Sequence, residues 1–339
     1  MNTSELQSVA RALVASGKGI LAADESSGTI KKRFDSIKLE STEENRRSYR
    51  DLLFTTQGAA DFISGVILYD ETIRQKSSDG KPFPQLLSGQ GIVPGIKVDT
   101  GLEPHAGFSN EQITKGLDGL RERLAEYRKL GAGFAKWRAV IAIGAGLPTL
   151  GNIAASAAAM ARYAALCQEV GIVPIVEPEV LMDGDHTIER CEEATTVTLK
   201  AMFDALFEQK IYLEGALLKP NMVLPGKKCP QQATPEQIAE ATIRCFRRVV
   251  PAAIPGIVFL SGGQGPEEAT ANLNAMNAMG VHPWELSFSY GRALQEPVLK
   301  TWAGQVANVP AAQKAYYHRA KMNGAARFGK YTAEQEKAA

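Results

Sequence analysis

The sequence lacks the features that mark membrane-bound, secreted and nucleic-acid-binding proteins. It contains no apolar run near the ~18 residues that cross a bilayer, and its amino-terminal stretch has no apolar segment long enough for a secretory signal. Its 339 residues include 38 Lys and Arg against 37 Asp and Glu, a formal charge of +1. Because neither sign is in excess, we expect no nucleic acid, acidic membrane or other bulk polyanion as a partner.

Cysteine and histidine are also scarce, with four of each. The cysteines form no CxxC pair and have no histidine at zinc-finger spacing, which predicts reduced thiols in the core and a cytoplasmic protein. The histidines are widely separated and form no HExxH motif. No metal site is therefore expected.

Short apolar or β-branched runs alternate with helical stretches along the chain. The predicted strands cover 20–24, 65–70, 94–99, 134–140, 173–180, 215–221, 256–263 and 286–291. The distances between them leave room for a loop, a helix and a return loop. No linker rich in Gly, Ser or Pro divides the series, so the pattern favours an α/β fold with one closed (β/α)8 TIM barrel over a two-domain doubly wound protein.

We therefore expect residues 1–339 to form one domain, with the barrel over about 18–323. An extra helix is predicted before the first strand, because its apolar residues share one helical face. These residues are Leu6, Val9, Leu13 and Val14. The small, polar tail at 324–339 is expected to be mobile.

Three segments carry signals for a helix start. The pairs Ser41 and Glu44, and Ser109 and Gln112, have the spacing of a capping box. The run TPEQ at 234–237 adds a proline in the first turn to the same spacing. Each segment predicts a helix that begins there.

Polar and charged residues collect at the carboxyl ends of the predicted strands, where such barrels hold their active sites. They are Asp24, Glu25, Ser26, Lys97, Asp99, Lys136, Arg138, Glu177, Glu179, Lys219, Ser261, Gly262, Gly263, Ser289, Gly291 and Arg292. Because strand side chains alternate, Lys136 shares a face with Arg138, and Glu177 shares one with Glu179. Buried charges need partners, so one interpretation is a purely structural ion-pair network. The other is an active site, where such networks concentrate.

Lys219 lies in the apolar strand ALLKPN. Burial beside Leu217 and Leu218, with a second cation such as Lys136 nearby, disfavours its charged form. An ordinary lysine has a pKa of about 10.4 and is almost fully protonated at neutral pH, so a nucleophilic lysine requires such a shift. A neutral lysine that attacks a ketone forms an iminium, an electron sink that allows a carbon–carbon bond to break. The alternative interpretation is a paired or snorkelling side chain.

Two glycine-containing segments predict phosphate binding. LSGGQG follows the seventh strand and precedes a helix start, so the amides of Gly262 and Gly263 and the helix terminus can hold an anion. SYGR follows the eighth strand, and its Arg292 can grip a phosphate by two hydrogen bonds. The loops after strands seven and eight recur as a phosphate site in these barrels. The alternative is that both segments are only tight turns.

Seven motifs in order resemble class I fructose-bisphosphate aldolase. They are GKGILAADES, GIKVD, FAKWR, VPIVEPE, LEGALLKPNM, FLSGGQ and FSYGRAL, and the resemblance runs from about residue 17 to about residue 332. It implies reversible cleavage of fructose 1,6-bisphosphate to dihydroxyacetone phosphate and glyceraldehyde 3-phosphate, in glycolysis and gluconeogenesis. It further implies a lysine Schiff base with no cofactor or metal, sugar phosphates as ligands, and a homotetramer.

The resemblance also implies roles for individual residues. Lys219 would form the Schiff base, Glu177 would transfer protons during carbinolamine dehydration, and Glu179 would support Glu177. Asp24 would take the proton of the C4 hydroxyl, and Lys136 would hold substrate hydroxyls and lower the pKa of Lys219. Without the resemblance, the sequence does not separate Asp24 from Glu25 or Asp99.

Two phosphate sites are implied in the same way. The residues implied for the C1 phosphate are Ser261, Gly262, Gly263, Ser289, Gly291 and Arg292. Those implied for the C6 phosphate are Ser26, Thr29, Arg33, Lys97 and Arg138.

The carboxyl-terminal tail bears on substrate preference. Many eukaryotic members of the family end in a longer tail with a terminal tyrosine, whereas the last tyrosine here is Tyr331. This difference predicts a weaker preference for the bisphosphate over fructose 1-phosphate.

One alternative function is another Schiff-base sugar-phosphate lyase, of the transaldolase or deoxyribose-phosphate aldolase type, which does not share these motifs. The other is a non-catalytic scaffold on the aldolase fold, which the intact set of catalytic side chains disfavours.

Overall fold

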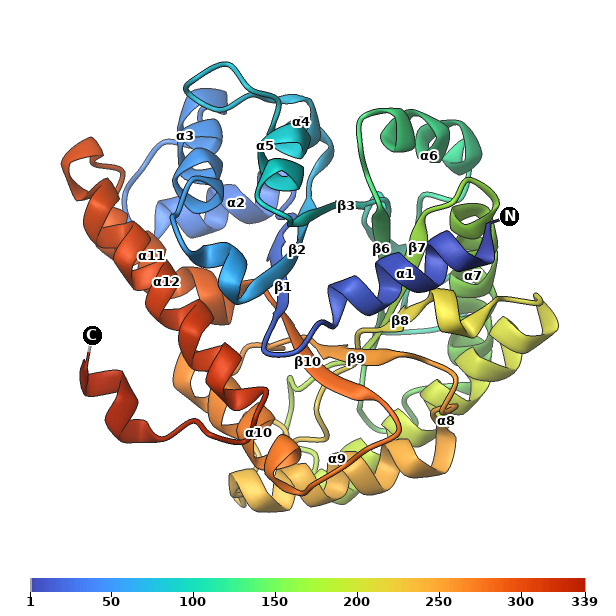
Figure 1. Cartoon of the computed structure of the whole chain (residues 1–339). Coiled ribbons are helices and arrows are strands. Elements are labelled where there is room, and N and C mark those ends of the chain that lie inside the picture. Colours follow the sequence, from blue (N-terminus) through green and yellow to red (C-terminus); the bar gives the residue numbers. More distant parts are fainter. Residues whose placement is uncertain (1, 339) are drawn as a thin grey trace.

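The computed structural model describes residues 2–338 and shows eight parallel strands closed into a barrel, with helices around the outside (Figure 1). Around the barrel the strands follow one another in chain order, and the last pairs with the first. They are β1 (Gly19–Ala23), β2 (Ile63–Leu68), β3 (Val93–Lys97), β6 (Phe134–Ile141), β7 (Val173–Val180), β8 (Leu217–Leu218), β9 (Gly256–Phe259) and β10 (Glu285–Tyr290). The predicted (β/α)8 barrel is confirmed, and each predicted strand overlaps an observed one.

Helices lie between successive strands, before the first and after the last. They are α1 (Thr3–Leu13), α2 (Ser27–Asp35), α3 (Glu43–Phe54), α4 (Asp70–Arg74), α5 (Phe83–Gly89), α6 (Leu120–Lys129), α7 (Leu150–Glu169), α8 (Ile188–Glu208), α9 (Pro235–Val249), α10 (Pro266–Ala278), α11 (Arg292–Trp302) and α12 (Val309–Ala326). Within residues 2–338, no helix has both the length and the hydropathy needed to span a membrane.

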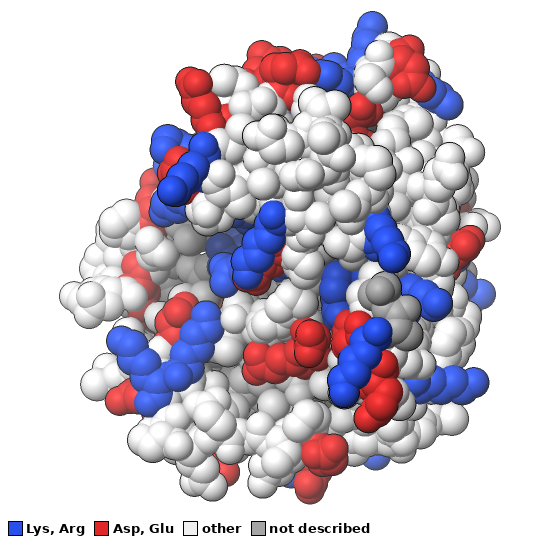
Figure 2. Space-filling model, turned by 90° about the vertical axis from the view of Figure 1, so that its left-hand side faces the viewer, with Lys and Arg blue, Asp and Glu red and all other residues white. Residues whose placement is uncertain are grey.

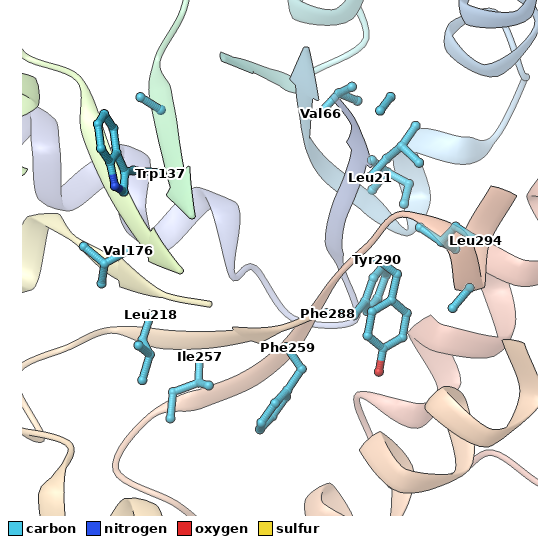
Figure 3. Packing of buried hydrophobic residues seen from close by; sticks show 14 of the residues in the cluster. Leu21, Val66, Trp137, Val176, Leu218, Ile257, Phe259, Phe288, Tyr290 and Leu294 are labelled. Atoms are coloured by element: carbon cyan, nitrogen blue, oxygen red, sulfur yellow. The ribbon is translucent and has the colours of Figure 1, made fainter. Parts of the chain in front are cut away.

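The alternation of strand side chains divides the apolar core into two parts. One set of strand residues packs outward against the helices; Leu21, Trp137 and Phe259 belong to it (Figure 3). The strand residues that alternate with this set point inward and form a second cluster inside the barrel, which includes Ile20 and Phe134. Leucine and alanine side chains of α1 belong to this inner cluster, so the predicted amino-terminal helix closes the amino-terminal end of the barrel.

The ring of Phe134 fills the barrel interior near its amino-terminal end. A Cβ atom on Gly95 of the neighbouring β3 would lie 2.3 Å from this ring, and one on Gly65 of β2 would lie 3.1 Å from it. Glycine at these positions therefore leaves the space that the aromatic ring occupies. The ring lies on the face of β6 that also carries Lys136 and Arg138, so an apolar floor underlies the charged side chains.

The helix-start predictions have mixed outcomes. Thr234 and Gln237 form the predicted capping box at α9. At α3 the capping oxygen is that of Thr42, one residue after the predicted Ser41. The helix predicted after Ser109 is wrong, because this segment forms a hairpin of β4 (Leu102–Pro104) and β5 (Gln112–Thr114).

The tail differs from the mobile segment that its composition predicts. Helix α12 continues to Ala326, and 333–338 form a turn of 3-10 helix. The Glu336 carboxylate accepts hydrogen bonds from Arg319 and from Nε2 of His318, the latter at 2.7 Å. Tyr331 is buried. The tail is therefore held against α12 by charge pairing that its small, polar composition does not reveal.

The inner cluster predicts a large cost for removing Phe134. The change Phe134→Ala should lower the free energy of unfolding by about 3–5 kcal/mol, because a buried ring is replaced by a cavity. Urea denaturation followed by circular dichroism measures this loss. The control Phe207→Ala removes a ring that is 81% exposed and should change stability by less than ~0.5 kcal/mol. Equal effects of the two changes would contradict this account of the floor.

Candidate active site

A cavity of about 420 Å³ opens at the carboxyl ends of the barrel strands. Every residue that the family resemblance implies for the site lines it. These are Asp24, Ser26, Thr29, Arg33, Lys97, Lys136, Arg138, Glu177, Glu179, Lys219, Ser261, Gly262, Gly263, Ser289, Gly291 and Arg292. These residues come from seven strand ends and from the helix that follows β1. They are as far as 268 positions apart in the chain, from Asp24 to Arg292.

The ammonium group of Lys136 lies at the centre of the site. It is 2.9 Å from Oδ2 of Asp24, 3.0 Å from Oε2 of Glu177 and 4.0 Å from Oδ2 of Asp99. Burial disfavours its charge, but these three carboxylates outweigh burial and raise the pKa of Lys136 above its ordinary value. Lys136 is therefore a permanent cation at neutral pH.

Glu177 links Lys136 to Lys219. Its Oε1 is 3.1 Å from Nζ of Lys219, while its Oε2 faces Lys136. The contact follows from strand pairing, because Leu218 of β8 lies beside Val176 of β7 and the amide of Lys219 donates to the Val176 carbonyl. Burial acts to raise the pKa of Glu177, but the two lysines and Arg138 hold it below its usual value. A carboxylate base thus lies within reach of both ammonium groups.

The structure separates Asp24 from Asp99. Asp24 lines the cavity and contacts Lys136 directly, and Lys136 and Lys219 hold the pKa of its carboxyl below the ordinary range against the effect of burial. Asp99 lies behind the cavity wall, where its Oδ1 is 2.8 Å from Nζ of Lys97. Only Asp24 is therefore placed to act on a bound molecule.

Glu25 has a different environment, although it neighbours Asp24 in the chain. Its carboxylate is 2.5 Å from Arg33 and 2.7 Å from Arg50, and it accepts a hydrogen bond of 2.9 Å from Nε2 of Gln295. These partners hold it in place and orient Arg33 at the cavity. The strand-end pattern does not indicate Arg50 and Gln295, because both lie within helices, α3 and α11.

The loop after β9 has the backbone of an anion-binding turn. Gly262 and Gly263 have φ values of +58° and +93°, a region that favours glycine, and glycine turns of this kind can present backbone amides to an anion. The buried side chain of Gln264 donates to the carbonyl of Ser261, and Asn272 of α10 donates to Gln264 at 2.6 Å. These two bonds fix the loop against the helix that follows it.

Ser289 adds a free polar group to this end of the cavity. Its hydroxyl is buried and finds no hydrogen-bond partner among the residues that the structure describes. A buried hydroxyl without a partner costs stability, so a bound ligand group is its natural partner.

The opposite side of the cavity holds three cations, each with a carboxylate partner. Arg33 pairs with Glu25, Lys97 pairs with Asp99, and Arg138 pairs with Glu179. The hydroxyls of Ser26 and Thr29 lie 3.1 Å apart at the start of α2. These cations and hydroxyls can hold a second anion.

Neither cysteine nor histidine contributes to the cavity. All four cysteines are buried and have free thiols, as predicted. Within the described part of the chain, no group of three or more His, Cys, Asp or Glu side chains is arranged to hold a metal ion.

Comparison with known proteins gives a consistent result. The family described as "Glycolytic: Fructose-bisphosphate aldolase class-I" matches residues 5–339. A probable fructose-bisphosphate aldolase class 1 of Xanthomonas campestris pv. campestris is 57% identical over 332 residues, covering 98% of this chain and 99% of its own. The cytosolic fructose-bisphosphate aldolase 5 of Arabidopsis thaliana is 55% identical over 329 residues, covering 97% and 92%.

Solved structures agree with these relatives. The structure of fructose-bisphosphate aldolase from Plasmodium falciparum, in complex with TRAP and a small-molecule inhibitor, matches with a TM-score of 0.97. The two sequences are 54% identical, and the match covers 98% of this chain and 96% of that one. Since the family match covers residues 5–339 and the structural match covers 98% of the chain, this chain belongs to the class I fructose-bisphosphate aldolase family.

Proposed function

We propose how this chain carries out the reaction of its family, the reversible aldol cleavage of fructose 1,6-bisphosphate to dihydroxyacetone phosphate and glyceraldehyde 3-phosphate. Lys219 forms an iminium with the ketone, and Glu177 and Asp24 move the protons. The observation that carries this proposal is the contact of one buried carboxylate, Glu177, with both Lys219 and Lys136. These groups lie in a cavity that is also lined by Gly262, Gly263 and further cations, which suits a ligand with phosphate groups.

Iminium formation begins with transfer of a proton from the Lys219 ammonium to Glu177, over the 3.1 Å between them. The free amine attacks the ketone and forms a carbinolamine. Because the nitrogen is then neutral, Glu177 has lost one of its two nearest positive charges and binds its proton more strongly. It gives that proton to the departing hydroxyl group as water leaves. The iminium restores the positive charge and again favours the ionised carboxylate.

Cleavage uses the Asp24 carboxylate as the base. Asp24 removes the proton of the C4 hydroxyl, the C3–C4 bond breaks, and its electron pair moves to the iminium nitrogen to give an enamine. Lys136 keeps Asp24 ionised and donates hydrogen bonds to the substrate hydroxyls. Protonation of the enamine at C3 and hydrolysis of the iminium release dihydroxyacetone phosphate.

The two phosphates occupy the two ends of the cavity. The C1 phosphate binds to the groups that follow β9 and β10, namely Ser261, Gly262, Gly263, Ser289, Gly291 and Arg292. The C6 phosphate binds to Ser26, Thr29, Arg33, Lys97 and Arg138. Glu179 supports the site by pairing with Arg138.

We also propose that residues 1–339 form one domain that acts in the cytoplasm as a homotetramer. Four buried, free thiols suit a reducing compartment, and one close relative is named cytosolic. The tetramer rests on the resemblance to the family. On the face shown in Figure 2, acidic and basic side chains are interspersed with uncharged ones, which agrees with small sugar phosphates rather than polyanions as ligands.

Borohydride reduction with dihydroxyacetone phosphate tests the position of the iminium. Reduction should leave one covalent adduct, on Lys219, that peptide mass spectrometry locates. The Lys219→Arg variant keeps the charge but lacks the amine nucleophile, so it should form no adduct and lose nearly all cleavage activity. An adduct on Lys136 or Lys97 would contradict the assignment of the nucleophile.

Glu177→Gln tests the proton transfers. The rate of iminium formation, followed by quenched-flow borohydride trapping, should fall by about 10²–10⁴-fold, the usual contribution of a general acid–base. The KM for fructose 1,6-bisphosphate should stay within about threefold, because the proposed phosphate contacts remain. The matched control is Glu169→Gln, whose carboxylate is exposed on α7 and should leave the rate unchanged. A trapping rate in Glu177→Gln equal to that of the wild type would refute this role.

A chelator tests whether a metal is needed. Because the lysine nitrogen supplies the electron sink, cleavage should keep its full rate after dialysis against EDTA. The assay couples product formation to a metal-independent dehydrogenase. Loss of activity in EDTA, restored by zinc, would overturn the iminium mechanism.

A further inference from the structure

Lys227 is a cation at the cavity that sequence analysis did not single out. It lies in the loop after β8, eight positions beyond Lys219, and lines the same cavity. Its Nζ would lie 2.4 Å from a Cβ atom placed on Gly263, and Nη1 of Arg292 would lie 3.5 Å from the same point. The two cations, one from the loop after β8 and one from the start of α11, therefore both lie close to the glycine turn that follows β9.

The backbone that carries Lys227 is fixed. Its amide donates to the carbonyl of Met182 at 2.9 Å, and the amides of Gly226 and Lys228 donate to neighbouring carbonyls of the loop after β7 at 2.8 Å each. A Cβ atom on Gly226 would lie 2.5 Å from the Gly184 carbonyl oxygen, so this close approach needs glycine. The side chain of Lys227 thus extends from an anchored position toward Gly263.

The charges at the two ends of the cavity are unequal. Each cation proposed for the C6 phosphate already has a carboxylate partner. Among residues 2–338, neither Lys227 nor Arg292 has a carboxylate within the 4.0 Å of an ion pair. Asp183, the carboxylate that lines the cavity from the loop after β7, is not paired with either. Two cations that lie near the same point without a counter-charge repel each other and favour an anion there.

We propose that Lys227 is a binding residue for the C1 phosphate and strengthens the hold on the ketone half of the substrate. This inference rests on the proposed function and adds a residue to its C1 phosphate site. Lys227 and Arg292 both lie close to Gly263, so a phosphate dianion at this turn meets donors from the segments that follow β8, β9 and β10. No ion pair joins Lys227 to Asp24 or Glu177, the proton-transfer groups of this scheme, so it acts on binding rather than on the chemical step.

The test is Lys227→Met, with Lys228→Met as the matched control. Lys228 is the next residue, is also exposed and does not line the cavity. The Kd of dihydroxyacetone phosphate, measured by isothermal titration calorimetry, should rise about tenfold in Lys227→Met, the effect of losing one charge-assisted hydrogen bond. Lys228→Met should match the wild type, and Lys227→Arg should restore most of the affinity.

Kinetics separate a binding role from a general loss of structure. In Lys227→Met the KM for fructose 1,6-bisphosphate should rise about tenfold while kcat stays within about twofold. The KM for glyceraldehyde 3-phosphate in the condensation direction should also stay within about twofold, because that phosphate binds at the other end of the cavity. An unchanged Kd for dihydroxyacetone phosphate, or equal losses in Lys227→Met and Lys228→Met, would overturn the inference.

Titration with inorganic phosphate distinguishes this inference from the proposed function. If the wild type formed no borohydride-trapped adduct, the iminium mechanism would fail. Binding of inorganic phosphate would still test Lys227 and Arg292, since this binding requires no covalent chemistry. Weaker phosphate binding by Lys227→Met than by Lys228→Met is expected, and equal binding would refute the role of Lys227.

Discussion

The site depends on the buried ammonium of Lys136, which lies between the carboxylates of Asp24 and Glu177. Without that charge, two carboxylates would remain in the barrel mouth with Lys219 as their nearest cation, and a buried charge left unpaired costs about 3–5 kcal/mol. The same contacts keep both carboxyl groups ionised at neutral pH. One ion-pair network therefore ties β1, β6 and β7 together and keeps ionised the two carboxylates that we propose as bases.

This network is possible because the strands alternate inside and outside. Along β6 the inward series runs from Phe134, in the apolar floor, to Lys136 and Arg138, in the charged layer above it. Helix α1 closes the barrel below the floor, so the charged layer meets solvent from the mouth. The apolar floor lowers the local dielectric and strengthens each charge interaction above it. The same strands therefore stabilise the fold through the apolar floor and position the charged side chains of the site.

The sequence predicts the strand ends, because hydrophobic runs and the residues that end them are local features. It also indicates Lys219, since a lysine in an apolar strand is unusual. It cannot assign partners to Asp24, Glu25 and Asp99, because those depend on side chains that reach in from far along the chain, such as Arg50 to Glu25. The false helix after Ser109 has a similar cause. The capping pattern is local, but pairing of Gln112 with Pro104 across a hairpin decides the structure there.

The unequal charges of the two phosphate ends bear on how products leave. In the proposed scheme, a phosphate at the C6 end would compete with Glu25 for Arg33, and the carboxylate would pair with Arg33 again when the phosphate departs. Release of the aldehyde product therefore leaves no bare cation in the cavity, which lowers its cost. At the C1 end, Arg292 and Lys227 have no such substitute, and the iminium also holds the ketone half. In this scheme the iminium bond and the cations at the C1 end both retain the ketone half of the substrate, while the aldehyde half is free to leave.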